Sequence, residues 1–209
     1  GTPTARVIGT DIRTSAPHAA LANGTLGHSD DYDDVGGFGH PAVILTPTVL
    51  ALGEELHKSG KDVLDAYVIG YEVGSRLSLG IGADHYARGW HSTVTLGTIA
   101  STAAASRLLG LNVEQTRTAF GIAASQTSGV IANFGTMTKP FHAGNAARSG
   151  VVSAMLAEMG FTGNQAIIEA YQGFGLVFGD PAPNFPGMTE ELGTAWRIMN
   201  LAAIKEWPC

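Results

Sequence analysis

The sequence is short of charge and of cysteine, and each shortage excludes a class of protein. Charged residues make up 14% of the 209 positions, while apolar residues make up 44%. Disordered chains have the opposite composition, so this chain is expected to fold around a core. The single cysteine, Cys209, cannot form an internal disulfide. A reducing, cytoplasmic location is therefore expected.

Long apolar runs and an excess of positive charge are also missing. No stretch of about 20 apolar residues is present, so we expect no membrane span, and the first residues show no signal-peptide pattern. A net charge of −6 argues against nucleic acid as a partner. Because the chain begins with Gly1 and its last residues read like the interior of a protein, we expect a fragment of a longer chain.

Small residues are abundant, since 29 Ala and 28 Gly together fill 57 positions. Helices that meet through small side chains can approach more closely than the usual 8–10 Å or so. Apolar spacing and capping signals then predict an array of helices. The expected helices cover residues 15–34, 42–60 (with Pro47 causing a kink or a delayed start), 61–78, 92–109, 112–129, 142–159 and 164–170.

The remaining segments are predicted as loops, a connection and a strand. Loops are expected at residues 79–89 and 129–140, a connection at 179–191, and a strand at 196–204. The domain division that follows is an all-α domain over residues 1–180 and a connection with the start of another element over 181–209.

An acidic cluster follows the first predicted helix, with four carboxylates in the five positions 30–34. On a helix, Asp30 and Asp34 would share one face, and Asp31 would lie one turn from His28. The cluster is either a solvated helix end or a binding site for a cation or ligand. Because its spacing also matches an aspartate-rich magnesium–diphosphate motif, a magnesium-dependent diphosphate-processing synthase is one alternative function.

Four further side chains are candidates for chemistry. His40 precedes a proline and is expected to project from a loop. His91 comes directly before a helix start, where unpaired N–H groups favour an anionic ligand. Lys139 and His142 lie where a loop opens another helix, a position unfavourable for a lysine unless an anion is bound. For each of them, a solvated surface side chain is the alternative interpretation.

Five separated motifs follow one another along nearly the whole chain. They are Asn23-Gly24, His28, Asp31-Tyr32-Asp33-Asp34 and His40-Pro41; Gly70-Tyr71-Glu72-Val73 with Arg76; Gly89-Trp90-His91-Ser92-Thr93 with the following helix to Leu111; Lys139-Pro140-Phe141-His142-Ala143-Gly144; and Gly160-Phe161-Thr162-Gly163. In this order they resemble the MmgE/PrpD family.

The resemblance implies a protein of two domains, an all-α helical bundle and a smaller α/β lid. On this expectation residues 1–180 form the helical domain without its first helices, and residues 181–209 contain the connection and the first strand of the lid. The family acts on small polycarboxylates without a metal or an organic cofactor, and its members are usually homodimers. Known activities are 2-methylcitrate dehydration, cis-aconitate decarboxylation and iminodisuccinate epimerisation.

The resemblance also implies an active site. By analogy with the decarboxylase, the catalytic positions are Asp31, His40, His91, Lys139 and Lys205. His91 is expected to transfer the proton, with His40 second. Lys139, Lys205 and His142 are expected to bind the substrate carboxylates.

Three functional classes stay open from the sequence. The leading expectation is a cofactor-independent lyase, a dehydratase or a decarboxylase, with an epimerase as its nearest alternative. The diphosphate synthase is the second class, and a non-catalytic helical interaction module is the third. One position departs from the decarboxylase pattern: Val35 stands where that enzyme has a threonine, and the spacing to His40 is one residue shorter.

Overall fold

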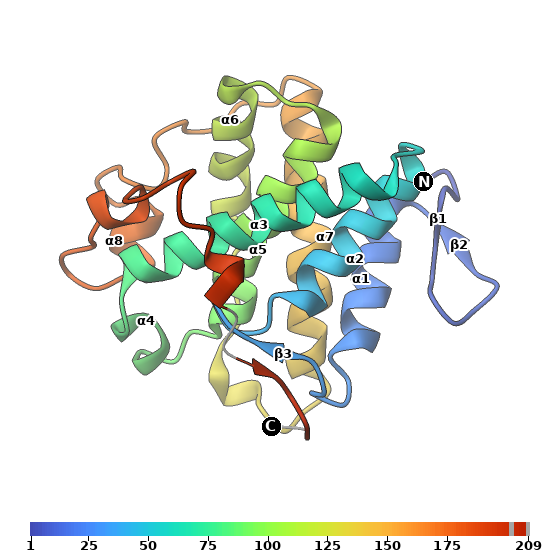
Figure 1. Ribbon diagram of the computed structural model, residues 1–209, viewed down its shortest axis with the longest axis horizontal. Coiled ribbons are helices and arrows are strands. Elements are labelled where there is room, and N and C mark those ends of the chain that lie inside the picture. The colour runs from blue at the N-terminus through green and yellow to red at the C-terminus, as the bar shows by residue number, and fades with distance from the viewer. Residues whose placement is uncertain (201–202, 208–209) are drawn as a thin grey trace.

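In the computed structural model, which describes residues 1–200 and 203–207, helices dominate and strands are short (Figure 1). Cys209 lies outside the described residues. The main helices are α1 (Ala16–Gly27), α2 (Ala42–Glu55), α3 (Gly60–Ile81), α5 (Ser92–Leu109), α6 (Val113–Ala124) and α7 (Thr138–Glu158). The all-α prediction is therefore confirmed.

The shorter elements lie between and after these helices. They are α4 (Asp84–Ala87), α8 (Phe174–Phe178), the 3₁₀ helices η1 (Ile131–Asn133), η2 (Pro186–Met188) and η3 (Arg197–Asn200), and the two-residue strands β1 (Ala5–Arg6), β2 (Arg13–Thr14), β3 (Asp34–Val35) and β4 (Ala203–Ile204). β1 pairs with β2, and β3 pairs with β4, both antiparallel.

The core is built around α5, in which 15 of the 18 residues are buried. α2, α3, α6 and α7 all pack against it, and α3 runs across it in Figure 1. The predicted bounds of this helix, 92–109, are confirmed. Among the described residues, none of the helices combines the length and the apolarity that a bilayer span requires.

Glycines allow the helices to touch through their backbones. A Cβ atom on Gly144 of α7 would come within 2.1 Å of the Leu21 carbonyl oxygen in α1. On the opposite side of α7, a Cβ on Gly150 would meet the Ser101 hydroxyl of α5 at 2.1 Å. The expectation of close packing through small residues is thus confirmed for these helix pairs, which leave no room for even one methyl group.

Side-chain caps fix where two of the helices begin. Ser59 and Asp62 form a reciprocal capping box at the start of α3, and Asn112 does the same with Gln115 at the start of α6. Asn112 was predicted as a cap and is confirmed. α2 begins at Ala42 and continues through Pro47, so its start is not delayed.

The prediction for residues 28–34 was wrong, because long-range contacts decide the conformation of this segment. The first helix does not continue to Asp34 but ends at Gly27, so Asp30 and Asp34 share no helix face. Asp31 adopts a positive φ of 54°, which no helix accepts. The Asp34 carboxylate instead accepts a hydrogen bond, at 3.0 Å, from the N–H of Ala42, the first residue of α2.

Helix and strand predictions also failed elsewhere. Residues 164–170 form turns, because the backbone there packs directly on Gly121, and the helix comes later, as α8. A strand was expected at 196–204; of the residues described there, 197–200 form η3 and Ala203–Ile204 form β4. The loop expected at 79–89 is partly helical, because α3 continues to Ile81 and α4 follows. α6 ends five residues before Gly129, and α7 begins four residues before His142.

Candidate active site

Asp31 joins three distant parts of the chain. Its Oδ2 forms an ion pair with Lys139 Nζ in the first turn of α7. Its Oδ1 lies 2.8 Å from Lys205 Nζ, which follows β4, and that ammonium also donates to the Asp31 carbonyl oxygen at 2.6 Å. Burial alone would raise the pKa of Asp31, but hydrogen bonds and charge from the two lysines outweigh it and lower that pKa.

Asp33 forms the second half of this ionic cluster. His28 Nδ1 lies 2.6 Å from Asp33 Oδ2, while His40 Nδ1 and Lys205 Nζ lie 3.0 and 2.8 Å from Oδ1. Burial again opposes ionisation, but these three partners prevail and hold the pKa of Asp33 far below its usual range. Both carboxylates are therefore ionised at neutral pH and are balanced by two ammonium groups.

The other two aspartates of the acidic segment lie outside this cluster. Asp30 is exposed. Asp34 is buried and caps α2, and its burial raises its pKa. The segment that looked like one acidic run is thus divided, with Asp31 and Asp33 in the ionic cluster and Asp34 in a structural role.

His91 is the N-cap residue of α5 and is buried, being only 2% exposed. Its Nδ1 lies 3.0 Å from Nδ1 of His142, so one ring donates to the other. Burial, together with the positive charge that His142, His28 and other neighbours can carry, lowers the pKa of His91 to about 3. His91 is therefore a neutral imidazole at physiological pH.

A cavity of about 270 Å³ opens beside His91 and His40. Phe134 lines it and packs edge-on against His91, and Lys139 Nζ lies 4.9 Å from the centre of the Phe134 ring. Ser92 and Thr93, in the first turn of α5, complete one wall. N–H groups in the first turn of a helix have no intrahelical partner, so this wall suits a carboxylate.

A larger pocket, of about 400 Å³, lies elsewhere, over α1 and α2. Its lining is mostly apolar, and among the lining residues only Asn23 and Thr46 have polar side chains. None of the predicted catalytic residues reaches it. The smaller cavity is the one that the predicted residues His40 and His91 line.

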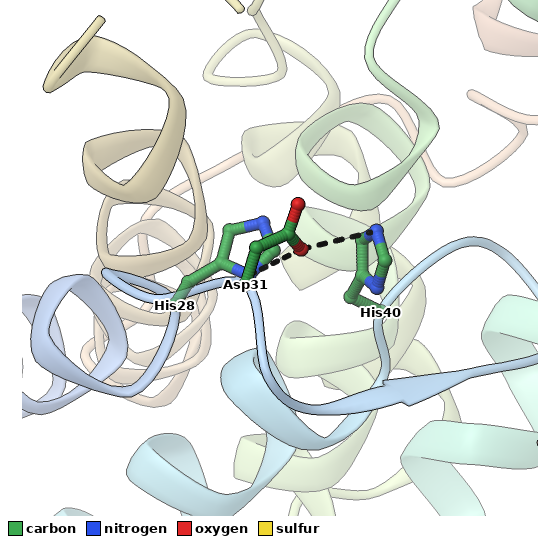
Figure 2. A group of neighbouring side chains, drawn as sticks. All are labelled: His28, Asp31 and His40. Atoms are coloured by element: carbon green, nitrogen blue, oxygen red, sulfur yellow. Dashed lines mark ion pairs between the residues drawn. The ribbon is translucent and has the colours of Figure 1, made fainter. Parts of the chain in front are cut away.

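The side chains of His28, Asp31 and His40 gather at one point in Figure 2. Their possible ligand atoms all lie within 4.8 Å of one another. Such a trio could hold a metal ion. Asp31, however, already binds the ammonium groups of Lys139 and Lys205. A divalent cation would have to displace or approach two positive charges, so the cluster suits an organic anion better than a metal.

The structure brings the predicted residues Asp31, His40, Lys139 and Lys205 into one cluster. Of the predicted site residues, His40 and His91 line the cavity, whereas Asp31, Lys139 and Lys205 lie outside its lining. His142 lies behind His91 and does not line the cavity, so its predicted contact with substrate remains a prediction. The sequence placed His28 in the acidic cluster and in the first family motif but gave it no role, and the structure buries it beside Asp33. Phe134 was missed, because it carries no local signal.

Comparison with known proteins places this arrangement in a family. The MmgE/PrpD N-terminal domain matches residues 1–185. Human cis-aconitate decarboxylase is 38% identical over 179 residues, which cover 83% of this chain and 37% of the human protein.

Two fungal proteins match more of the chain. The cis-aconitate decarboxylase-like protein oryM of Aspergillus oryzae is 34% identical over 93% of this chain and 44% of its own length. The cis-aconitate decarboxylase of Aspergillus terreus is 32% identical over 98% of this chain and 44% of its own length. The chain therefore spans about two fifths of the length of these relatives. With its all-α fold, its ordered motifs and these matches, the chain belongs to the MmgE/PrpD family.

Proposed function

We propose that this protein is a lyase that acts on a small polycarboxylate, of the cis-aconitate decarboxylase type, without a metal or organic cofactor. The observation that carries the proposal is the binding of Lys139 and Lys205 to Asp31, next to two histidines and a cavity. The relatives named cis-aconitate decarboxylase support the same reaction class.

The lysines and the α5 N-terminus recognise the substrate carboxylates. An ammonium has three N–H groups, and Asp31 Oδ2 accepts from one of those of Lys139. Lys139 does not line the cavity, but its Nζ lies over the ring of Phe134, which does. A substrate carboxylate that extends past Phe134 can accept another of these N–H groups, while a second carboxylate lies at the α5 N-terminus, beside Ser92 and Thr93. Cations placed in advance stabilise the negative charge that develops next to a carboxylate during the reaction.

Decarboxylation requires one bond cleavage and one proton. The bond between carbon and the leaving carboxylate breaks, its electron pair moves across the adjacent double bond, and the far alkene carbon takes a proton. The products are carbon dioxide and an unsaturated dicarboxylate.

Two histidines can move that proton. The sequence placed His91 first and His40 second, but the low pKa of His91 leaves it without a proton to donate. His40, which faces Asp31 at 4.0 Å through Nε2, is therefore the candidate donor. In dehydration or epimerisation, neutral His91 can take a proton from the substrate carbon next to a carboxylate. Once protonated, His91 can donate that proton back to the substrate. His142, through its contact with Nδ1, fixes which nitrogen of His91 carries the hydrogen.

The proposal is tested by offering the intact protein cis-aconitate, 2-methylcitrate and iminodisuccinate in parallel. Carbon dioxide release, alkene absorbance and solvent deuterium uptake separate decarboxylation, dehydration and epimerisation. We expect carbon dioxide release from cis-aconitate. Turnover of another substrate would change the assigned reaction, and inactivity towards all three would favour a helical interaction module.

Lys139→Met should lower kcat/KM by about 10²–10³-fold, because one preplaced cation is lost. The matched control is Lys61→Met, which also removes a lysine paired with an aspartate, Asp65, but on the surface. The control should retain full activity. Equal activity of both variants would remove Lys139 from the site.

A further inference from the structure

One of the family motifs has no part in the site described above. Glu72 and Arg76 lie one turn apart on α3, each only 4% exposed, and form an ion pair of 2.5 Å. Burying two charges is costly unless their remaining polar atoms find partners. The identity of those partners indicates what the pair does.

Within the part of the chain that the structure describes, every further side-chain hydrogen bond of the pair goes to one segment, residues 188–197. Arg76 Nη1 donates to the carbonyl oxygens of Glu190 and Met188 at 2.5 and 3.4 Å, and Nη2 donates to that of Ala195 at 3.0 Å. Glu72 Oε2 accepts the N–H of Arg197 at 2.7 Å. All these partners are backbone atoms, so the pair fixes the path of the segment rather than reading its side chains.

That path leads to the site. Eight residues after Arg197 comes Lys205, whose N–H donates to the Asp33 carbonyl oxygen at 3.0 Å and whose ammonium reaches Asp31 and Asp33. The strand pairing that precedes it, β3 with β4, covers only two residues on each side. A two-stranded contact of this length is too short to hold itself in water.

We propose that Glu72 and Arg76 are positioning residues for Lys205: they fasten residues 188–197 to α3 and so deliver the Lys205 ammonium to Asp31 and Asp33. The effect on turnover rests on the proposed function, whereas the effect on the position of Lys205 does not. Neither side chain touches the cavity or the substrate.

The first test follows the accessibility of Lys205. The Lys205 side chain is 6% exposed and that of Lys139 is 16% exposed. In intact protein treated with an acetylating reagent, we expect slow labelling of both lysines by mass spectrometry. Arg76→Met should raise Lys205 labelling by about tenfold or more, because an anchored segment becomes free to open. Lys139 labelling should stay unchanged.

The matched control is Arg88→Met. The guanidinium of Arg88 also donates to a backbone carbonyl oxygen, that of Gly179, at 3.0 Å. Gly179 precedes residues 188–197, the segment that Glu72 and Arg76 hold. Arg88→Met should leave Lys205 labelling at the wild-type level. Amide hydrogen exchange should rise in residues 188–206 of Arg76→Met and not in α5. Where Arg76→Met does not fold, Arg76→Lys and Glu72→Gln each remove part of the same bonds and should show a smaller increase.

The second test is a double-mutant cycle on turnover. Arg76→Met and Lys205→Met should each lower kcat/KM, and the combined variant should be no worse than Lys205→Met alone, because both act through one ammonium. Losses that multiply would overturn the proposal, as would folded Arg76→Met with wild-type labelling of Lys205. If Lys205 labelling rises in Arg76→Met while the wild-type protein turns over no polycarboxylate, the positioning role of Glu72 and Arg76 is supported and the proposed function is wrong.

Discussion

Asp31 and Lys139, 108 positions apart in the sequence, form an ion pair that joins the loop after α1 to the first turn of α7. A lysine at a helix N-terminus is disfavoured by the helix dipole. Here a carboxylate partner offsets that cost. The sequence predicted an anion beside Lys139, and the Asp31 carboxylate of the protein itself is one such anion.

Neutralising Asp31 should disable the site, whereas neutralising its neighbour should not. Asp31→Asn removes the charge that holds two lysines, and we expect kcat/KM to fall by about 10²-fold. Asp30→Asn, one residue away and exposed, is the matched control and should stay within about twofold of the wild type. Steady-state kinetics on both variants would decide, and equal activities would show that the lysines need no carboxylate.

His91 should contribute a pH dependence to stability. Its pKa is lowered to about 3, so the folded protein binds fewer protons than the unfolded chain between pH 6.5 and 3. Neutral His91 therefore makes its full contribution to the free energy of unfolding above about pH 6.5. That contribution is lost as the pH falls, because the unfolded chain then binds a proton that the folded protein does not. At pH 5 the loss amounts to about 2 kcal/mol.

Urea unfolding at pH 7 and pH 5 measures this effect. His91→Gln should lose less stability between the two values than the wild type. His18→Gln, which changes an exposed histidine on α1, should lose as much as the wild type. An unchanged pH slope in His91→Gln would mean that His91 is protonated without penalty.

Metal chelation should leave activity intact. Asp31, a member of the trio that could hold a metal, is occupied by two ammonium groups. We expect full kcat in the presence of EDTA after dialysis against it. If EDTA abolishes activity and added magnesium restores it, the result would instead support a magnesium-dependent diphosphate synthase, the alternative that the aspartate-rich segment suggested.

A methyl group between α1 and α7 should be costly. Gly144→Ala places a Cβ against the Leu21 carbonyl oxygen and the Thr25 side chain. Because these are packed helices, we expect a loss of about 1–3 kcal/mol in the free energy of unfolding. Gly60→Ala, at the start of α3 with open space around it, is the control and should be neutral or slightly stabilising.

Local patterns in the sequence were enough for most of the helices. The bounds of α5 and the cap at Asn112 follow from spacing and capping chemistry that operate within a few residues. Local patterns gave the wrong conformation for residues 30–34, because the conformation there depends on Lys139, Lys205 and His28. No local rule anticipates an ion pair that closes over more than 100 residues.

Local context singled out the acidic cluster, His40, His91, Lys139 and His142 as candidates, whereas the family motifs assigned the catalytic roles and added Lys205. Spacing alone identified His91 as a residue before a helix start, and the structure agrees. It could not show that His142 lies behind His91, or that Glu72 and Arg76 bind the backbone of residues 188–197. Those relationships arise from how α3, α5 and α7 pack, and the packing is set by the whole core.

The attachment of Lys205 has a consequence for the order of events during synthesis. Asp31 and Lys205 are 174 residues apart, so at about 5–20 residues per second their emergence from the ribosome is separated by roughly 10–35 s. The last of the helices that surround α5 ends at Glu158, so Lys139, the ammonium partner of Asp31 within these helices, is made before Lys205. Maturation of the cluster is therefore a late event, and a nascent chain that already has its helices still lacks the second ammonium group.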